Sequence, residues 1–249
     1  MADASWLRPD LGVPGVGALM STRLGGRSAA PFDSLNLKHG IGDDEAVVAR
    51  NQALFASAMD GARPVWLNQV HGARVVRIGA VDVDAAPQEA DGSFSTERGV
   101  ACAVQVADCL PVLFAAPGGV AAAHAGWRGL AGGVLEATVA ALRDATGAAV
   151  ADVHAWLGPC IGPERFEVGA DVLAAFGADA AHPAPAFFRP REAGKWLADL
   201  PGLARERLRG CAVQHIEGGH WCTVSEASRF FSFRRDRVTG RMAAAVWLR

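Results

Sequence analysis

Three apolar segments in close succession constrain the fold of this chain more than any other feature. They predict buried strands at Val100–Val106, Leu110–Ala115 and Val120–His124. Only a few residues separate them, and the Pro-Gly-Gly sequence at 117–119 is typical of a tight turn. Connections this short exclude parallel crossovers, which need about a dozen residues or more. The sequence also lacks a G-x-G-x-x-G motif, so a regular doubly wound dinucleotide-binding fold is not expected.

Helices and further strands alternate irregularly along the rest of the chain. Apolar residues at helical spacing predict a helix from about Gly129 to Thr146. The remaining predicted strands are Pro64–Gln69, Ala73–Ile78, Val153–Leu157, Ala212–Ile216, Arg229–Phe233 and Met242–Leu248. Two further helices are predicted at Asp171–Phe176 and Trp196–Leu208, and Pro201 should bend or begin the second one. Pro183, Pro185 and Pro190 mark a loop between them. We therefore predict one domain, residues 1–249, with a mixed α/β (α+β) architecture in which helices cover the sheets.

The composition excludes several classes of protein. Charged residues make up 20% of the chain and its net charge is -2, which gives no electrostatic signature of nucleic-acid binding. Two arginine-rich segments, 204–210 and 234–241, are interpreted as solvated faces of a helix and a hairpin. No signal peptide is evident, and no apolar run approaches the ~20 residues of a membrane span. The five cysteines lack a secreted-type pattern, so we expect a cytoplasmic protein without nucleic-acid or membrane partners.

Two histidines and a cysteine occur at the ends of predicted strands, where apolar residues are the default. His71 follows VWLNQV, Cys109 lies between two apolar runs, and His124 ends a third run. Two imidazoles and a thiolate form a three-ligand set of the kind found in catalytic zinc sites, which keep a fourth position open. The wide spacing differs from that of structural zinc sites, so the fold has to bring the three residues together.

The same three residues admit two other interpretations. His71 and His124 could be hydrogen-bonded histidines of the core or of turns, with Cys109 as a small buried apolar residue. Alternatively, Cys109 could be a nucleophile that one of the histidines activates. Metal content separates these interpretations, because a thiolate bound to zinc is poorly available as a nucleophile.

Polar residues near these segments are further candidates. Arg23 precedes a glycine pair, which suits phosphate or carboxylate binding but also describes an ordinary arginine before a turn. If residues 65–71 are extended, Gln69 shares a face with His71, and its amide could orient substrate or water. Asp91 is either a turn residue or a carboxylate near the pocket. Asp91 and His39 are also weak candidates for a general acid.

Several ordered motifs resemble those of the laccase-domain family, and the resemblance covers nearly the whole chain. This family has been called multicopper polyphenol oxidase and is now described as purine nucleoside phosphorylases with adenosine deaminase activity. The motifs are STRLGG at 21–26, SLNL at 34–37, NQVHG at 68–72, ADG at 90–92, ADCLPVLF at 107–114, AHAGWRG at 123–129, LGPCIG at 157–162 and CT at 222–223.

The resemblance implies an αββα-type sandwich in which His71, Cys109 and His124 bind the metal. It implies zinc, with copper as an alternative, and small-molecule partners, namely a purine nucleoside and phosphate. With only seven histidines, a four-copper oxidase is a poor match, although a single copper site remains an alternative. Two other functions stay open: an amidase that removes a misincorporated L-serine from peptidoglycan precursors, and a metal-binding protein without enzymatic activity. The catalytic residues predicted here are Arg23, Gln69 and Cys109.

Overall fold

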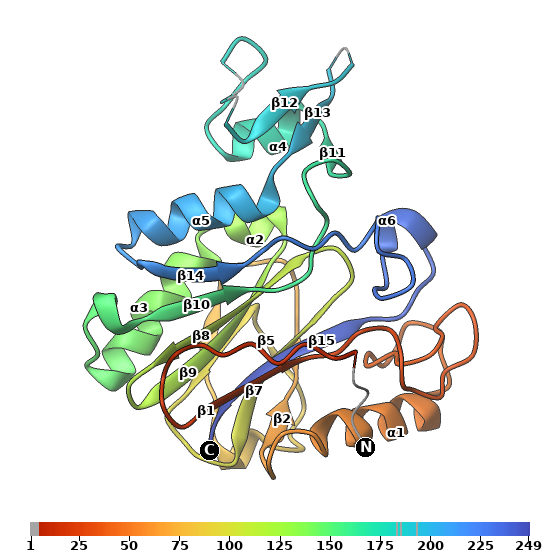
Figure 1. Cartoon of the computed structure of the whole chain (residues 1–249), viewed down its shortest axis with the longest axis vertical. Helices are drawn as coiled ribbons and strands as arrows, with labels where there is room; N and C mark the ends of the chain where they lie inside the picture. Colours follow the sequence, from red (N-terminus) through yellow and green to blue (C-terminus); the bar gives the residue numbers. More distant parts are fainter. Residues whose placement is uncertain (1–4, 183, 185, 193) are drawn as a thin grey trace.

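The chain folds into four layers in the order helix, sheet, sheet, helix (Figure 1). The computed structural model describes residues 5–182, 184, 186–192 and 194–249. The layers confirm the predicted mixed α/β sandwich. Pro183 and Pro185 of the predicted loop lie outside the described residues. No helix within the described ranges is long and apolar enough to cross a membrane.

The first sheet has four strands and is covered on its outer face by a helix. In spatial order its strands are β1 (Val16–Met20), β15 (Met242–Leu248), β7 (Val100–Val106) and β2 (Arg63–Val65). Side chains alternate along β7, so that Ala101 and Ala103 face the helix while Cys102 and Val104 face the second sheet. The covering helix, α1 (Glu45–Ala56), begins where the Asp44 side chain accepts the N–H groups of its first turn.

The second sheet has six strands and packs face to face on the first through a shared apolar layer. In spatial order its strands are β14 (His215–Gly218), β10 (His154–Leu157), β8 (Leu110–Ala116), β9 (Gly119–Ala125), β6 (Gly92–Ser95) and β4 (Val75–Arg77). The predicted strand pair β8–β9 is antiparallel, with Pro111 opposite His124. Strands β7 and β8, by contrast, belong to different sheets. Residues 107–109 therefore cross from one sheet to the other, and Cys109 lies at this crossing.

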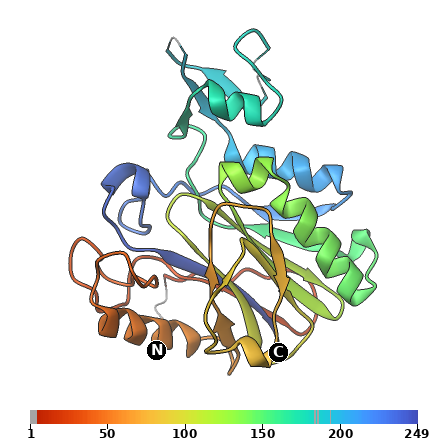
Figure 2. The same cartoon turned by 180° about the vertical axis from the view of Figure 1, so that it is seen from behind.

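Helices cover the outer face of the six-stranded sheet. They are α2 (Trp127–Ala131), α3 (Val134–Thr146) and α5 (Leu200–Gly210), and Figure 2 shows α3 lying over the sheet. The predicted helix from Gly129 to Thr146 is therefore divided, because Gly133 adopts a left-handed conformation between α2 and α3. The predicted helix Trp196–Leu208 is wrong at its start, where residues 196–198 form a strand. Asp199 caps α5, and Pro201 begins the helix rather than bending it.

A small three-stranded sheet projects from the sandwich at the top of Figure 1. It consists of β11 (Glu167–Val168), β13 (Trp196–Ala198) and β12 (Phe188–Pro190), with α4 (Ala170–Ala175) beside it. The short helix predicted at Asp171–Phe176 is thus confirmed, whereas Pro190 belongs to an edge strand instead of a loop.

Two predicted strands differ from the structure near the site. The strand at Pro64–Gln69 is broken at Trp66 into β2 and β3 (Leu67–Asn68), the latter pairing with β5 (Gln88–Glu89). The strand predicted at Arg229–Phe233 is absent, and this part of the chain turns into α6 (Phe233–Asp236), whose first turn is capped by Ser232. Both differences from the prediction arise at local backbone turns, which the pattern of apolar residues does not reveal.

Candidate metal centre and its two pockets

The fold brings His71, Cys109 and His124 together. One ligand atom from each lies within 4.8 Å of the others, and no other group of three such residues occurs in the described part of the chain. The Cys109 Sγ atom is 3.8 Å from His71 Nε2, and the two imidazole rings meet edge to face with centroids 4.8 Å apart. His71 is exposed, Cys109 half-buried and His124 buried, so the cluster opens to solvent on one side. This is the donor set predicted from the sequence.

A buried carboxylate orients the cluster from behind. Asp91, which is fully buried, accepts a hydrogen bond of 2.7 Å from His124 Nδ1. It also accepts the backbone N–H groups of Val70, His71 and Gly72, at 2.7 to 3.1 Å. The carboxylate therefore fixes both the ring of one histidine and the loop that carries the other. Of the two interpretations of Asp91, the carboxylate near the pocket is the one found.

Electrostatics favour a thiolate at Cys109. Burial alone would raise the pKa of Cys109, but the charge and hydrogen bonds of His124 and His71 outweigh it and lower the pKa to about 6. Burial would likewise lower the pKa of His124, yet the Cys109 thiolate and the Asp91 carboxylate raise it to about 9. Hydrogen bonds from His124 and Gly72 outweigh burial at Asp91 and lower its pKa, which makes this carboxyl a poor proton donor.

Backbone geometry at the cluster is unusual in two places, and a glycine lies close to the thiol. His71 and Asp108 both have positive φ angles, of 62° and 93°, in a region that non-glycine residues seldom adopt. Asp108 is held there because its carboxylate accepts hydrogen bonds from Thr223 Oγ1 and from the Arg234 N–H, both at 2.6 Å. Gly126 faces the cluster, and a Cβ atom there would lie 2.9 Å from the Cys109 Sγ atom. The absence of a side chain at 126 leaves room for the thiolate.

The donor set fits a bound metal ion. A thiolate with two imidazoles suits zinc, and a histidine that donates its second N–H to a carboxylate is the usual support of a metal ligand. Asp91 provides this support to His124 through Nδ1. The Nε2 atom of His124 is thereby left for the metal.

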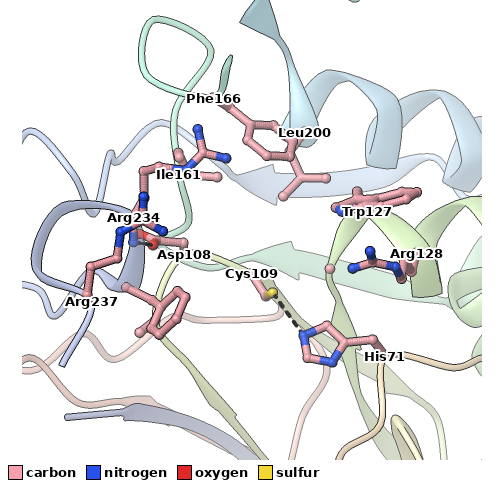
Figure 3. A pocket seen from close by; sticks show the side chains of 13 residues that line it. His71, Asp108, Cys109, Trp127, Arg128, Ile161, Phe166, Leu200, Arg234 and Arg237 are labelled. Carbon is pink, nitrogen blue, oxygen red and sulfur yellow. Dashed lines mark hydrogen bonds between the residues drawn. The ribbon is translucent and has the colours of Figure 1, made fainter. Parts of the chain in front are cut away.

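An outer pocket of about 310 Å³ adjoins the cluster (Figure 3). Trp127 and Arg128 lie on one side of it and Arg234 and Arg237 on the other, with Cys109 at its base. Aromatic rings and guanidinium groups alternate here: the Arg128 guanidinium lies 4.3 Å from the Trp127 ring centroid, and that of Arg234 lies 5.6 Å from the Phe166 ring. The outer pocket thus combines flat apolar surfaces with positive charge.

An inner pocket of about 290 Å³ lies on another side of the same cluster. Four residues, His71, Ala107, Cys109 and Phe233, line both pockets, so the two meet at the candidate metal centre. The inner pocket is also lined by Lys38, Gln69, Gln105, Val106, His124 and Arg241.

The other residues predicted for the site lie outside the His71–Cys109–His124 cluster. Gln69 lines the inner pocket, but its amide forms two hydrogen bonds with the backbone of Gln105, at 2.8 and 2.9 Å. It reaches this position from a loop, because the chain is not extended through residues 65–71 and the predicted alternation fails. Arg23 lines neither pocket: its guanidinium bonds to Asp33 and to the carbonyl of Ala227. His39 pairs with Glu45 away from the cluster.

The interpretation of the arginine-rich segment 234–241 as a solvated hairpin face is wrong. Arg234 and Arg237 line the outer pocket, and Arg241 lines the inner one. Sequence reasoning missed these residues together with Lys38, Trp127 and Phe233. For Phe233 and the arginines after it, the signal was an aromatic run, Phe230, Phe231 and Phe233, followed directly by Arg234 and Arg235, which only the α6 turn brings to the cluster.

Comparisons with known proteins agree with this fold. A Neisseria meningitidis crystal structure superposes with a TM-score of 0.90 and 43% identity, covering 98% of this chain and 99% of that chain. The structure of YlmD from Geobacillus stearothermophilus superposes with a TM-score of 0.89 and 34% identity, covering 100% of this chain and 98% of that chain. Escherichia coli purine nucleoside phosphorylase YfiH is 48% identical over 237 residues, 94% of each chain. A Pseudomonas aeruginosa protein also named a purine nucleoside phosphorylase is 47% identical over 247 residues, 98% of each chain.

The family assignment rests on nearly the full length of the sequence. A family model described as multi-copper polyphenol oxidoreductase laccase matches residues 17–249, which include the His71–Cys109–His124 cluster and both pockets. This chain therefore belongs to the multi-copper polyphenol oxidoreductase laccase family.

Proposed function

We propose that this chain is a zinc-dependent purine nucleoside phosphorylase that cleaves adenosine, inosine, guanosine and methylthioadenosine and also deaminates adenosine. One observation carries the proposal: the His71–Cys109–His124 cluster opens into pockets that combine aromatic rings with cations that form no ion pair among the described residues. A purine requires flat apolar surfaces, and phosphate requires positive charge. The names of the relatives point to the same reaction class.

Zinc fits the donor set better than copper. Imidazole and thiolate ligands suit both ions, but blue-copper sites add a weak axial ligand, usually methionine. No methionine is among the residues that line the two pockets. His71, Cys109 and His124 would hold the ion, with Asp91 orienting His124. When bound, zinc supplies a Lewis acid that can polarise an oxygen atom and lower the pKa of a coordinated water.

The side chains of the outer pocket provide binding and charge. The rings of Trp127, Phe166 and Phe233 offer surfaces on which a purine can stack. Neither Arg128 nor Arg237 has a carboxylate partner in the described residues, and their charge is therefore available to an anionic or electron-rich substrate. Asp108 is the single acidic residue of the lining, and both of its carboxylate oxygens already accept hydrogen bonds. Binding and orientation, rather than proton transfer from Asp108, are thus what these side chains contribute.

Product analysis tests the proposal. Zinc-loaded protein should convert inosine and phosphate into hypoxanthine and ribose 1-phosphate, and adenosine and water into inosine and ammonia. A chelator should abolish both reactions, and added zinc should restore them. Base release that consumes no phosphate would contradict phosphorolysis. Loss of serine from a muramyl–L-serine substrate, without any nucleoside turnover, would assign the site to an amidase instead.

A further inference from the structure

We propose that Lys38 and Arg241 form the subsite for the phosphate co-substrate in the inner pocket, while the outer pocket receives the nucleoside. This assignment rests on the phosphorolysis proposed above. It divides the two substrates between two pockets that meet at Cys109 and His71. Phosphate and nucleoside would then approach the candidate metal centre from different sides.

The two cations of the inner pocket have no carboxylate partner among the residues that line it. Its lining contains a lysine and an arginine but no carboxylate. The Lys38 ammonium donates to the Gln105 Oε1 atom at 3.4 Å, and Arg241 Nη1 donates to the carbonyls of Thr239 and Gly240. Neither side chain forms an ion pair among the described residues. A bound dianion would supply the missing countercharge.

The two cations are close enough to influence each other. Burial and the positive charge of Arg241 both lower the pKa of Lys38. Asp108 and Cys109 are the acidic groups that act on Arg241, but the Asp108 oxygens are occupied by Thr223 and by the Arg234 N–H, and the Cys109 sulfur would bind the metal. An anion between Lys38 and Arg241 would relieve their repulsion, whereas a neutral ligand would not.

A buried side chain fixes the spacing of the two cations. Asn36, which is fully buried, accepts the backbone N–H of Lys38 at 3.1 Å and that of Arg241 at 3.0 Å through the same Oδ1 atom. It also donates to the Lys38 carbonyl at 3.1 Å. Gln69 holds the backbone of Gln105, whose own amide donates to the Leu37 carbonyl at 2.5 Å. The pocket is therefore organised before any ligand binds, as expected of a substrate subsite.

Lysine at position 38 is unusual in this chain, because nearly all of the basic residues are arginines. Of its 24 basic residues, all but Lys38 and Lys195 are arginines. An ammonium is a compact charge with three donors, which can contact a phosphate oxygen where a planar guanidinium would need more space. Lys195 is exposed on the small sheet and provides a matched control.

Equilibrium binding of inorganic phosphate tests the assignment without turnover. Calorimetric titrations would use zinc-loaded wild-type protein and the variants Lys38→Met, Lys38→Arg, Arg241→Gln, Lys195→Met and Arg128→Gln, each with and without hypoxanthine, after thermal melts confirm that they fold. Losing one charge-assisted contact should weaken phosphate binding at least about tenfold in Lys38→Met and Arg241→Gln. Lys38→Arg should recover part of the loss, and Lys195→Met should bind as the wild type does. In turnover assays, Lys38→Met should raise KM for phosphate more than KM for inosine.

Two results would overturn the subsite. One is phosphate binding that Arg128→Gln abolishes and Lys38→Met leaves intact, since phosphate would then occupy the outer pocket. The other is the absence of phosphate binding to the wild type under both conditions. Failure of the proposed function gives a different result: phosphate binds in a Lys38-dependent manner, but no nucleoside is cleaved.

Discussion

The His124 Nδ1 atom donates a 2.7 Å hydrogen bond to the buried Asp91 carboxylate, which also accepts the N–H of His71. One acidic side chain thus positions two of the three proposed metal ligands, although it lies 20 residues from one and 33 from the other along the chain. Such a residue supports the metal without touching it.

Replacing Asp91 with asparagine should weaken zinc binding about 10- to 100-fold, because the ring of His124 loses its ionised acceptor. The loop N–H groups would also lose an ionised acceptor, at a cost of about 1–3 kcal/mol in the free energy of unfolding. Competition with a chromogenic chelator measures the affinity. Asp144→Asn, on the exposed side of α3, is the matched control and should change neither quantity. Wild-type zinc affinity in Asp91→Asn would refute the positioning role.

Alkylation of Cys109 in the zinc-free protein should persist to unusually low pH. The lowered pKa keeps the reactive thiolate populated as the pH falls, so the rate should reach half its maximum near pH 6. Burial raises the pKa of the Cys102 thiol to about 12, and this residue should remain unmodified in the folded protein. Peptide mass spectrometry after pulses of iodoacetamide at several pH values follows both residues. A Cys109 midpoint close to that of an ordinary thiol would contradict the thiolate–imidazolium pair, and zinc should protect Cys109 at each pH at which the ion stays bound.

Gly126→Ala should damage the metal centre more than the fold. The backbone at 126 has φ -64°, which alanine adopts without strain, but the added Cβ would lie 2.9 Å from the Cys109 Sγ atom and 3.1 Å from His71 Cδ2. Overpacking of this kind costs about 1–3 kcal/mol, and the displaced ligands should bind zinc less tightly. Gly210→Ala, at the end of α5 with open space around it, should change stability by less than about 1 kcal/mol and leave zinc binding intact. Equal zinc affinities in the two variants would show that the close approach at 126 is unimportant.

The sequence predicted the core strands and the clustering of His71, Cys109 and His124 well because both depend on strong local signals. The runs around Cys109 are continuous and apolar, and histidine or cysteine at a strand end is conspicuous. Strand β1 and helix α1 were not predicted, although Asp44 followed by a helix-forming segment gave a readable N-cap signal.

Other features depended on contacts that no local pattern reports. That residues 107–109 cross between two sheets follows from the packing of β7 against β15 and of β8 against β9. The positive φ of His71 depends on Asp91, 20 residues away, which holds its loop. Likewise, Arg241 reaches the inner pocket because Asn36 accepts its N–H. The arginine-rich segment 234–241 therefore resembled a solvated surface in the sequence, because the residue that positions Arg241 is distant along the chain.

Zinc stoichiometry measured by elemental analysis, on wild-type protein and on Cys109→Ala, His71→Ala and His124→Ala, tests the central claim most directly. Cys211→Ala, which removes a half-buried thiol outside both pockets, serves as the control. The account predicts one zinc ion per wild-type and Cys211→Ala chain, and loss of both zinc and inosine phosphorolysis in the three ligand variants, with folds retained. A full equivalent of zinc in Cys109→Ala, or undiminished phosphorolysis by zinc-free protein, would contradict it.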